Sequence, residues 1–292
     1  MAPFAVLVAS ATLIVLAAVV APRHKLVALG LSGTVVLVLP WYAGPTPLVR
    51  GLFALNFICV FRMIDLVRSR EAWRAPRRIA HALSFVDTRL LQRQRPRFDA
   101  GGLLAGLAWG AVAIAAFLVV QRFAPRWPSS SLAIRWGAGL VFVYAAIEGG
   151  YRVVRALHRA VGFETPPLHV WPLASLSVAE LWGTRWARPV SHWLRANCFM
   201  PLARRRRPAL GVFLGFVVSG VGHAHPVLVA LGPAMAALML GYFLVQGAAV
   251  AVEARLGAAR WRRPVRRVWT IAIMITTSPL FVEPCLRVVL PT

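Results

Sequence analysis

The sequence is poor in acidic residues and in lysine, and it has few cysteines. Asp and Glu together number 9 among 292 residues, against 33 basic residues, of which only Lys25 is a lysine. The three cysteines, Cys59, Cys198 and Cys285, stand far apart and form no CxxC pair. A disulfide framework needs an even cysteine count, and a thiolate metal site needs clustered ligands. The sequence therefore indicates neither, and we expect the cysteines to serve in packing.

The sequence also lacks any recognisable division into parts. It contains no internal repeat, no low-complexity linker and no soluble-domain boundary. The longest break between apolar runs lies at 151–207. We therefore expect residues 1–292 to form a single membrane-embedded domain.

Apolar residues are abundant, at 59% of the chain, and the mean hydropathy is +0.68. About 20 apolar residues are needed to cross roughly 30 Å of hydrocarbon. The segment 2–20 has no leading basic residues and no clear cleavage site, so we expect it to remain as the first span rather than to act as a signal peptide. The pattern predicts an all-α polytopic membrane protein with about eight transmembrane helices. These lie near 4–21, 26–43, 47–67, 101–121, 131–150, 208–226, 228–250 and 268–290.

The basic residues lie mainly in alternate connections between these spans. The segments 22–25, 68–100, 151–207 and 251–267 hold 2, 9, 10 and 6 of them, which is 27 of the 33. By the positive-inside rule these segments face the cytoplasm. We therefore expect a multi-pass protein of a bacterial inner membrane with the N- and C-termini outside. Topology and contact with anionic lipids account for the net charge of +24 without a nucleic-acid partner.

Two of these cytoplasmic segments are long enough to fold. The first, 68–97, spaces apolar residues among arginines in the way that is typical of an amphipathic helix at the headgroup level. The second, 151–207, contains five prolines and four tryptophans within 164–203. We expect interfacial helices in both segments.

Two motifs lie in and after the second segment. The stretch "SLSVAELWGTRWARPVSHWLR" (175–195) resembles the signature of the wax-synthase branch of the membrane-bound O-acyltransferases. The matching residues are Glu180, Trp182, Gly183, Arg185 and Trp186. An apolar helix with a Ser-Gly-x-x-His motif follows in that family, and this chain has "FVVSGVGHAH" at 216–225. The resemblance covers roughly 165–250 and implies the helical membrane fold of that family.

The resemblance implies an O-acyltransferase that moves a fatty acyl group from acyl-CoA to the hydroxyl of a lipophilic alcohol. It implies His223 as the general base, with acyl-CoA as co-substrate and no tightly bound cofactor. Membrane lipids are the other partners that we expect. The candidates for assisting His223 are His192, Ser219 and His225. The candidates for binding substrate are Glu180, Trp182, Arg185 and Trp186.

The chemistry of the residues agrees with the role implied for His223. Esterification needs a base that accepts the hydroxyl proton, and imidazole titrates near neutral pH. Burial in hydrocarbon favours the uncharged ring, which can accept a proton. Gly215, Gly220 and Gly222 leave space beside it for a neighbouring helix or a channel wall. We expect no metal site, because no Cys, Asp or Glu lies near the His223–His225 pair.

The chain departs from the family pattern at four positions. Leu181 replaces an aromatic residue, and Thr184 replaces an arginine. Ala187 stands where the family usually has Asn or His, and Ala224 stands where it usually has Glu. A catalytically degenerate lipid-binding protein therefore remains an alternative. A third hypothesis is a transporter that relays protons through intramembrane charged residues, and it predicts inverted repeats that the sequence does not display.

Several of these residues also have simpler interpretations. His192, five positions beyond Ala187, supplies either a missing polar group or an interfacial contact. Trp182 and Trp186, four apart, are predicted to share one helical face and to bind substrate or anchor the interface. Arg185 either binds phosphate or pairs with Glu180. His225 lies on another helical face or in a turn at Pro226.

The remaining charged residues near the spans have such interpretations too. The cluster 204–207 is a topological stop signal or a phosphate site. Asp65, Arg62 and Glu148 are expected to pair with one another or to line a polar cavity, because isolated charges are costly at membrane depth.

Overall fold

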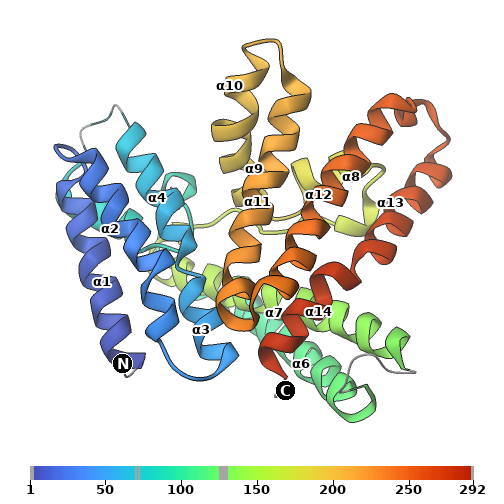
Figure 1. Cartoon of the computed structure of the whole chain (residues 1–292), viewed down its shortest axis with the longest axis horizontal. Coiled ribbons are helices and arrows are strands. Elements are labelled where there is room, and N and C mark those ends of the chain that lie inside the picture. Colours follow the sequence, from blue (N-terminus) through green and yellow to red (C-terminus); the bar gives the residue numbers. More distant parts are fainter. Residues whose placement is uncertain (1–2, 70, 72, 125–130, 291–292) are drawn as a thin grey trace. The chain divides into compact units, whose positions relative to one another are not determined.

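The protein is almost entirely helical in the computed structural model, which describes residues 3–69, 71, 73–124 and 131–290 (Figure 1). The α-helices before the signature segment are α1 (Pro3–Val20), α2 (Lys25–Leu37), α3 (Pro47–Ala54), α4 (Phe57–Arg68), α5 (Ala75–Leu83), α6 (Ala100–Phe123) and α7 (Leu132–Ala160). Those that follow are α8 (Val178–Glu180), α9 (Arg188–Leu194), α10 (Met200–Ala203), α11 (Pro208–Leu231), α12 (Pro233–Arg255), α13 (Arg263–Thr277) and α14 (Pro279–Val289).

Short elements connect these helices. The 3-10 turns are η1 (Leu39–Tyr42), η2 (Thr88–Leu90), η3 (Pro172–Ala174) and η6 (Ala258–Arg260), and the π-helical turns are η4 (Leu181–Arg185) and η5 (Arg195–Phe199). Strands β1 (Gln92–Arg93) and β2 (Phe163–Glu164) pair antiparallel, with Gln92 opposite Glu164.

The long apolar helices confirm the predicted membrane spans. Among the described residues, 7 helices are long and apolar enough to cross a membrane, and α13 with α14, bent by 41°, makes up to 8. The protein is therefore an integral, multi-pass membrane protein. Three spans end at least five residues later than predicted: α7 continues to Ala160, α11 passes through Pro226 to Leu231, and α12 continues to Arg255. A proline removes one backbone donor, and a transmembrane helix tolerates that loss.

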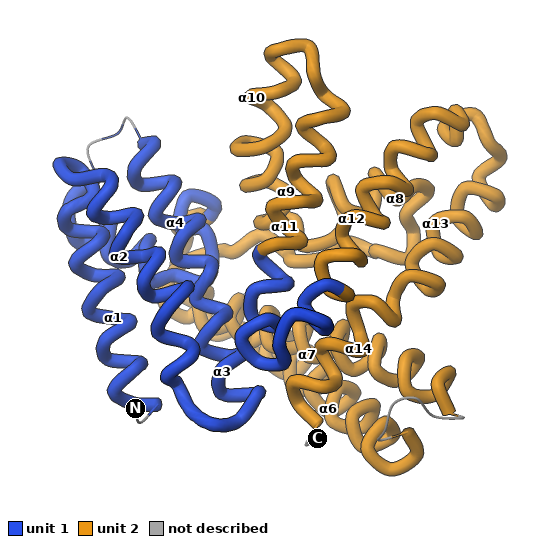
Figure 2. The backbone as a smooth tube through the Cα atoms, viewed as in Figure 1, with its two compact units in different colours: residues 1–90, 222–237 blue, residues 91–221, 238–292 orange. Residues whose placement is uncertain are grey.

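The chain divides into two compact units, which Figure 2 shows in different colours. Unit 1 comprises residues 1–90 and 222–237, and unit 2 comprises residues 91–221 and 238–292. Both units are discontinuous in sequence, and α11 contributes residues to each. The single membrane-embedded domain expected from the sequence stays a prediction.

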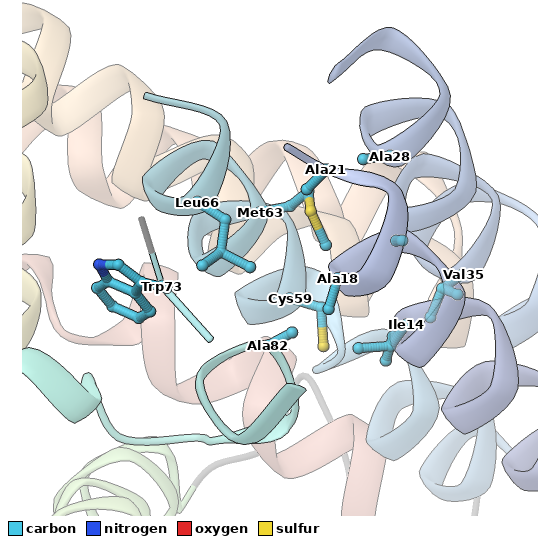
Figure 3. Close-up of a cluster of buried hydrophobic side chains, with 11 residues drawn as sticks. Ile14, Ala18, Ala21, Ala28, Val35, Cys59, Met63, Leu66, Trp73 and Ala82 are labelled. Atoms are coloured by element: carbon cyan, nitrogen blue, oxygen red, sulfur yellow. The ribbon is translucent and has the colours of Figure 1, made fainter. Parts of the chain in front are cut away.

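Unit 1 is held by small residues on the facing sides of its helices. Figure 3 shows the core, which is formed by Ile14, Ala17, Ala18, Ala21, Ala28, Val35, Cys59, Met63, Leu66, Trp73 and Ala82. Alanines at the contacts let helix backbones approach closely, which gives membrane helices their packing energy. In the segment predicted to be an interfacial helix, α5 is the helical part, and its Arg78 Nε donates to Ala18 O of α1 at 2.9 Å.

In unit 2, α6 and α7 pack along each other through glycines. A Cβ built on Gly149 would lie 2.9 Å from Gly106 O, and one built on Gly106 would lie 3.1 Å from Gly149 O. Backbone therefore meets backbone at this crossing.

A buried ion pair joins α7 to α14 in the same unit. Arg135 Nε and Nη2 donate to the two carboxylate oxygens of Glu283 at 2.7 and 2.9 Å. Arg287 also donates to Glu283 at 2.8 Å. Because both Arg135 and Glu283 are almost fully buried, each charge depends on the other for its solvation.

Candidate active site

The signature segment begins with a short helix whose backbone is capped from two sides. Ser177 Oγ accepts from Glu180 N at 2.9 Å. Glu253 of α12 accepts from Val178 N at 2.8 Å and from Ala179 N at 3.2 Å. The first N–H groups of a helix have no partner within it, so a buried carboxylate there satisfies them. The role of Glu253 was not predicted from the sequence, because an acidic residue near the end of an apolar span is the only indication of it there.

Two of the predicted binding residues, Glu180 and Arg185, form an ion pair. Arg185 Nε donates to Glu180 Oε1 at 2.7 Å, while Leu176 N donates to Glu180 Oε2 at 2.9 Å. Burial alone would raise the pKa of Glu180, but the Leu176 N–H and the Arg185 guanidinium bring that pKa below its usual value. The arginine therefore stabilises the segment itself, which is the interpretation that the sequence left open beside phosphate binding.

Trp182 is packed among aromatic rings and fixed by a buried amide. Its Nε1 donates to Gln246 Oε1 at 3.1 Å, and Gln246 Nε2 donates to Thr277 Oγ1 at 2.7 Å. Its ring lies 5.9 Å from the ring of Phe243 and 6.1 Å from that of Tyr242. An indole N–H buried among apolar groups needs such an acceptor. Trp182 is thus positioned by α12 and α13 together.

The expected single helical face for the two tryptophans is wrong in its geometry. Residues 181–185 form a π-helical turn, Trp186 is extended (φ −103°), and Ala187 is left-handed (φ 42°). The Trp182 and Trp186 rings are nonetheless in contact, with centroids 6.0 Å apart. The helical segment that carries Trp182 is therefore interrupted before His192. His192 lies exposed on the separate helix α9.

The segment before the signature brings a histidine against Trp186. His169 is buried, its ring centroid lies 4.3 Å from that of Trp186, and its Nδ1 lies 2.9 Å from Glu148 Oε2. Arg152 Nε donates to the other oxygen of Glu148 at 2.7 Å. The expectation that Glu148 pairs with Asp65 or Arg62 is wrong, because this carboxylate is taken up by Arg152 and His169.

The histidine motif lies on α11. His223 is half-buried in unit 1, and its ring centroid lies 6.2 Å from that of Phe57, tilted by 52°. A Cβ built on Gly222 would lie 2.9 Å from Phe57 Cε2, so this glycine lets the phenylalanine ring approach the helix backbone. Ser219, half-buried on the same helix, belongs to unit 2.

His225 has a structural partner. Its Nε2 lies 2.9 Å from Val36 O of α2, in unit 1. The predicted alternative of a turn at Pro226 is wrong, because α11 is helical through this proline. The hydrogen bond to a backbone carbonyl indicates that His225 joins two helices.

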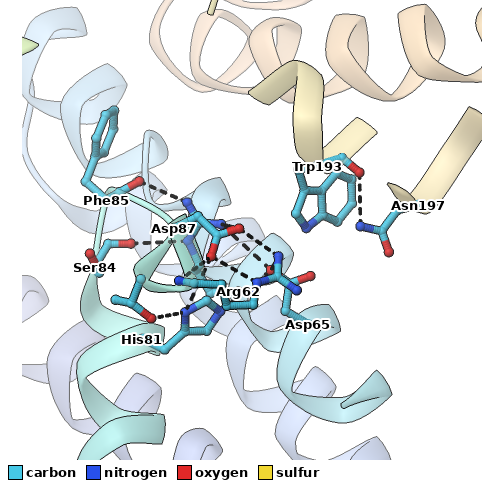
Figure 4. Close-up of polar contacts among 10 residues, drawn as sticks. Arg62, Asp65, His81, Ser84, Phe85, Asp87, Trp193 and Asn197 are labelled. Atoms are coloured by element: carbon cyan, nitrogen blue, oxygen red, sulfur yellow. Dashed lines mark hydrogen bonds and ion pairs between the residues drawn. The ribbon is translucent and has the colours of Figure 1, made fainter. Parts of the chain in front are cut away.

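An ionic cluster in unit 1 contains the buried Arg62, Asp65 and Asp87 (Figure 4). Arg89 Nη2 lies 2.7 Å from both Asp65 Oδ2 and Asp87 Oδ2, and Arg62 Nη1 lies 3.8 and 3.6 Å from the same two atoms. Burial raises the pKa of Asp87, but hydrogen bonds from Arg89 and the charge of Arg62 bring it below its usual value. The expected pairing of Arg62 with Asp65 is confirmed.

This cluster also contains the group of described side chains whose spacing would suit a metal ion. Ligand atoms of Asp65, His81 and Asp87 all lie within 4.8 Å of one another. Two guanidinium groups already balance the two carboxylates, and Arg89 bridges them where a shared cation would bind. The donor set therefore fits a structural ion-pair network better than a metal site.

The described part of the chain has cavities in both units. One, of about 240 Å³, is apolar and lined by Ala105, Ala108, Trp109 and Val112 of α6. The other, of about 330 Å³, is lined by residues of unit 1 that include Lys25, Glu71 and Arg78. Neither lining includes His223.

The structure brings together Glu180 with Arg185 and Trp182 with Trp186, all in unit 2. His223 and His225 belong to unit 1, where each has its own surroundings. The roles expected for these residues in catalysis and binding stay predictions.

Comparison with known proteins supports the resemblance found in the motifs. No protein-family model matches the chain. Among curated proteins, it is 27% identical over 161 residues to the probable long-chain-alcohol O-fatty-acyltransferase 3 of Arabidopsis thaliana. The chain is a distant relative of a wax-synthase-type acyltransferase. The match covers 50% of this chain and 47% of the plant protein, so it spans about half the length of this wax-synthase-type relative.

Proposed function

We propose that this protein is a membrane-bound O-acyltransferase that esterifies a lipophilic alcohol with the acyl group of acyl-CoA. The observation that carries the proposal is the similarity to a plant protein named as a long-chain-alcohol O-fatty-acyltransferase. The multi-pass helical fold supports it, because the long chains of both reactants partition into the bilayer. The basic segments facing the cytoplasm would meet acyl-CoA there, and arginine suits its phosphates.

In this proposal His223 is the general base. The imidazole accepts the hydroxyl proton while the alcohol oxygen attacks the thioester carbonyl, and the carbon–sulfur bond then breaks. The departing thiolate takes up the proton from the imidazolium, so that ester and free CoA are the products. His223 is suited to this role by its half-buried position on an apolar helix.

The test is the His223→Ala variant, purified in detergent and assayed for ester formation from palmitoyl-CoA and hexadecanol. General base catalysis contributes about 10²- to 10⁴-fold, so we expect at least a hundredfold loss of kcat. His24→Ala is the control, because His24 is exposed at the start of α2, and it should keep the wild-type rate.

Unchanged turnover in a monodisperse His223→Ala protein would reject the assignment of the base. If the wild-type protein makes no ester from a broad panel of alcohols but retains bound acyl chains, the chain is instead a lipid-binding relative of the enzyme. If His223→Ala does not stay monodisperse, His223→Gln in the same assay decides the question.

A further inference from the structure

His169 and Glu148 form a buried pair beside the signature segment that the proposed reaction does not yet use. The side chains of His169 and Glu148 are 2% and 8% exposed, and Nδ1 of the ring lies 2.9 Å from Oε2 of the carboxylate. Glu148 belongs to α7, and His169 belongs to the segment between β2 and η3. Residues far apart on the chain thus meet at one hydrogen bond inside unit 2.

The hydrogen bond to Glu148 places a proton on Nδ1 of the His169 imidazole. Glu148 is already balanced by Arg152, whose Nε donates to Oε1 at 2.7 Å. An ionised carboxylate only accepts, so the ring nitrogen facing it must donate. In the neutral tautomer with the proton on Nδ1, the other ring nitrogen, Nε2, carries a lone pair and can accept a hydrogen bond.

Nε2 of His169 is the atom of this pair that can meet another molecule. It makes no hydrogen bond to any described residue. Some side-chain nitrogen and oxygen atoms are fully covered by protein and have no hydrogen bond. Among the described residues, these atoms belong to Ser10, Arg50 and His81. Since His169 Nε2 is not one of them, it is not completely enclosed by protein.

The surroundings of the ring are aromatic, and one further ring contact joins them to a residue that lines an open apolar cavity. His169 lies 4.3 Å from the ring of Trp186 and 5.3 Å from that of Tyr144. Tyr144 in turn contacts Trp109 edge-on at 5.4 Å, and Trp109 lines the apolar cavity of about 240 Å³ on α6. A single acceptor nitrogen in an apolar wall suits a ligand with one hydroxyl and a long hydrocarbon chain.

A purely structural role does not account for the pair, because the same segment is already held to α7 by other bonds. Tyr151 Oη donates to Pro166 O at 3.0 Å, and Arg155 Nε donates to Thr165 O at 2.9 Å. His158 Nδ1 lies 2.9 Å from Thr165 Oγ1. A buried carboxylate and imidazole are costly to add to such a tether.

We propose that His169, held by Glu148, binds the acceptor alcohol by accepting a hydrogen bond from its hydroxyl group at Nε2. This inference rests on the proposed function for the identity of the ligand as an alcohol. His169 is then a substrate-binding residue, and Glu148 is a positioning residue that fixes the orientation of the ring.

The test compares His169→Phe, His169→Gln and Glu148→Gln with the matched control His158→Ala. Phenylalanine keeps a ring against Trp186 but removes the acceptor, so KM for hexadecanol should rise about tenfold, the effect of one lost hydrogen bond. KM for palmitoyl-CoA should stay within about twofold of the wild type, as the alcohol alone contacts Nε2. His169→Gln and Glu148→Gln should give smaller rises in KM for the alcohol. His158→Ala removes a tether of the same segment and should leave both KM values unchanged.

Two outcomes overturn the inference. In one, His169→Phe leaves KM for hexadecanol at the wild-type value; in the other, it raises both KM values equally, as a merely structural change would. If His169→Phe does not stay monodisperse, the comparison of His169→Gln with His158→Ala is decisive by the same criteria.

A binding assay separates this inference from the proposed reaction. If the wild-type protein makes no ester, labelling of purified protein by a long-chain alcohol bearing a photoreactive diazirine replaces turnover as the readout. Labelling that falls about tenfold in His169→Phe but not in His158→Ala supports alcohol binding at Nε2 even though the reaction fails. Equal labelling of all three proteins rejects it.

Discussion

Glu253 is the residue on which the first turn of the signature segment depends. Its carboxylate accepts from two backbone N–H groups of α8 and from Trp269 Nε1 at 3.1 Å, and it is 5% exposed. Removal of one acceptor leaves buried donors unpaired, which costs roughly 1–3 kcal/mol for each unsatisfied group.

We therefore expect Glu253→Ala to lower the free energy of unfolding by about 2–4 kcal/mol and to open the segment to trypsin after the half-buried Arg185, which Trp186 follows. Thermal unfolding and limited proteolysis in detergent measure the two effects. Glu253→Gln keeps one acceptor oxygen and should fall between this variant and the wild type. Wild-type proteolysis rates in Glu253→Ala would show that α8 does not need the carboxylate.

At the scale of single residues, the sequence identifies residue types but not partners. The pairing of Glu180 with Arg185 is foreseeable because the two lie in one short stretch. The partners of Glu148 are not, since His169 lies 21 positions away on an irregular segment. Periodicity predicts which face a residue occupies, whereas this contact depends on how a loop returns to a helix.

At the scale of elements, the crossing of α6 and α7 offers a direct test of close packing. A Cβ on Gly149 would lie 2.9 Å from Gly106 O and 3.1 Å from Trp109 Cβ, whereas one on the adjacent Gly150 would meet nothing within 4 Å. Gly149→Ala must therefore push the two helices apart, and we expect a loss of roughly 1–3 kcal/mol in the free energy of unfolding.

Gly150→Ala is the matched control, one position along the same helix. It should leave stability unchanged or raise it by up to about 1 kcal/mol, because alanine favours the helix. Unfolding by denaturant in a fixed detergent gives both values. Equal stability of the two variants would mean that α6 and α7 do not meet at this glycine.

The spans were predictable because twenty apolar residues in a row have few other stable arrangements. The signature segment was not, although the sequence did predict that it folds. Its π-helical turns at 181–185 and 195–199 and the left-handed Ala187 depend on contacts with α12 and α13 that no local pattern encodes. Propensity alone favours a plain α-helix there, which is the interpretation that proved wrong.

At the scale of the whole molecule, the bent pair α13 and α14 decides on which side the chain ends. Most basic residues near the pair lie at its N-terminal end. The segment 251–267 holds six basic residues, whereas Arg287 is the one basic residue after position 268. From the positive-inside rule we expect the pair to cross the membrane as one span. We expect the position after Leu290 to lie outside the cytoplasm. Alkaline phosphatase fused there should be active, and a fluorescent protein fused there should not fluoresce.

The same two fusions placed after Gly257 are the control, and they should give the reverse result. A fluorescent fusion after Leu290 would instead indicate that the pair enters and leaves the membrane on the cytoplasmic side. The described residues would then contain seven complete spans, which are the 7 that qualify without the bent pair.

The ion pair between Arg135 and Glu283 has a consequence for the order in which the protein is made. The ribosome synthesises α7 well before α14. The Arg135 guanidinium therefore lacks its carboxylate partner, Glu283, until 148 further residues have been added. The later helix, α14, carries the carboxylate that neutralises it. Synthesis of α14 and neutralisation of this charge therefore coincide, and a nascent chain stalled before α14 retains Arg135 without its carboxylate partner.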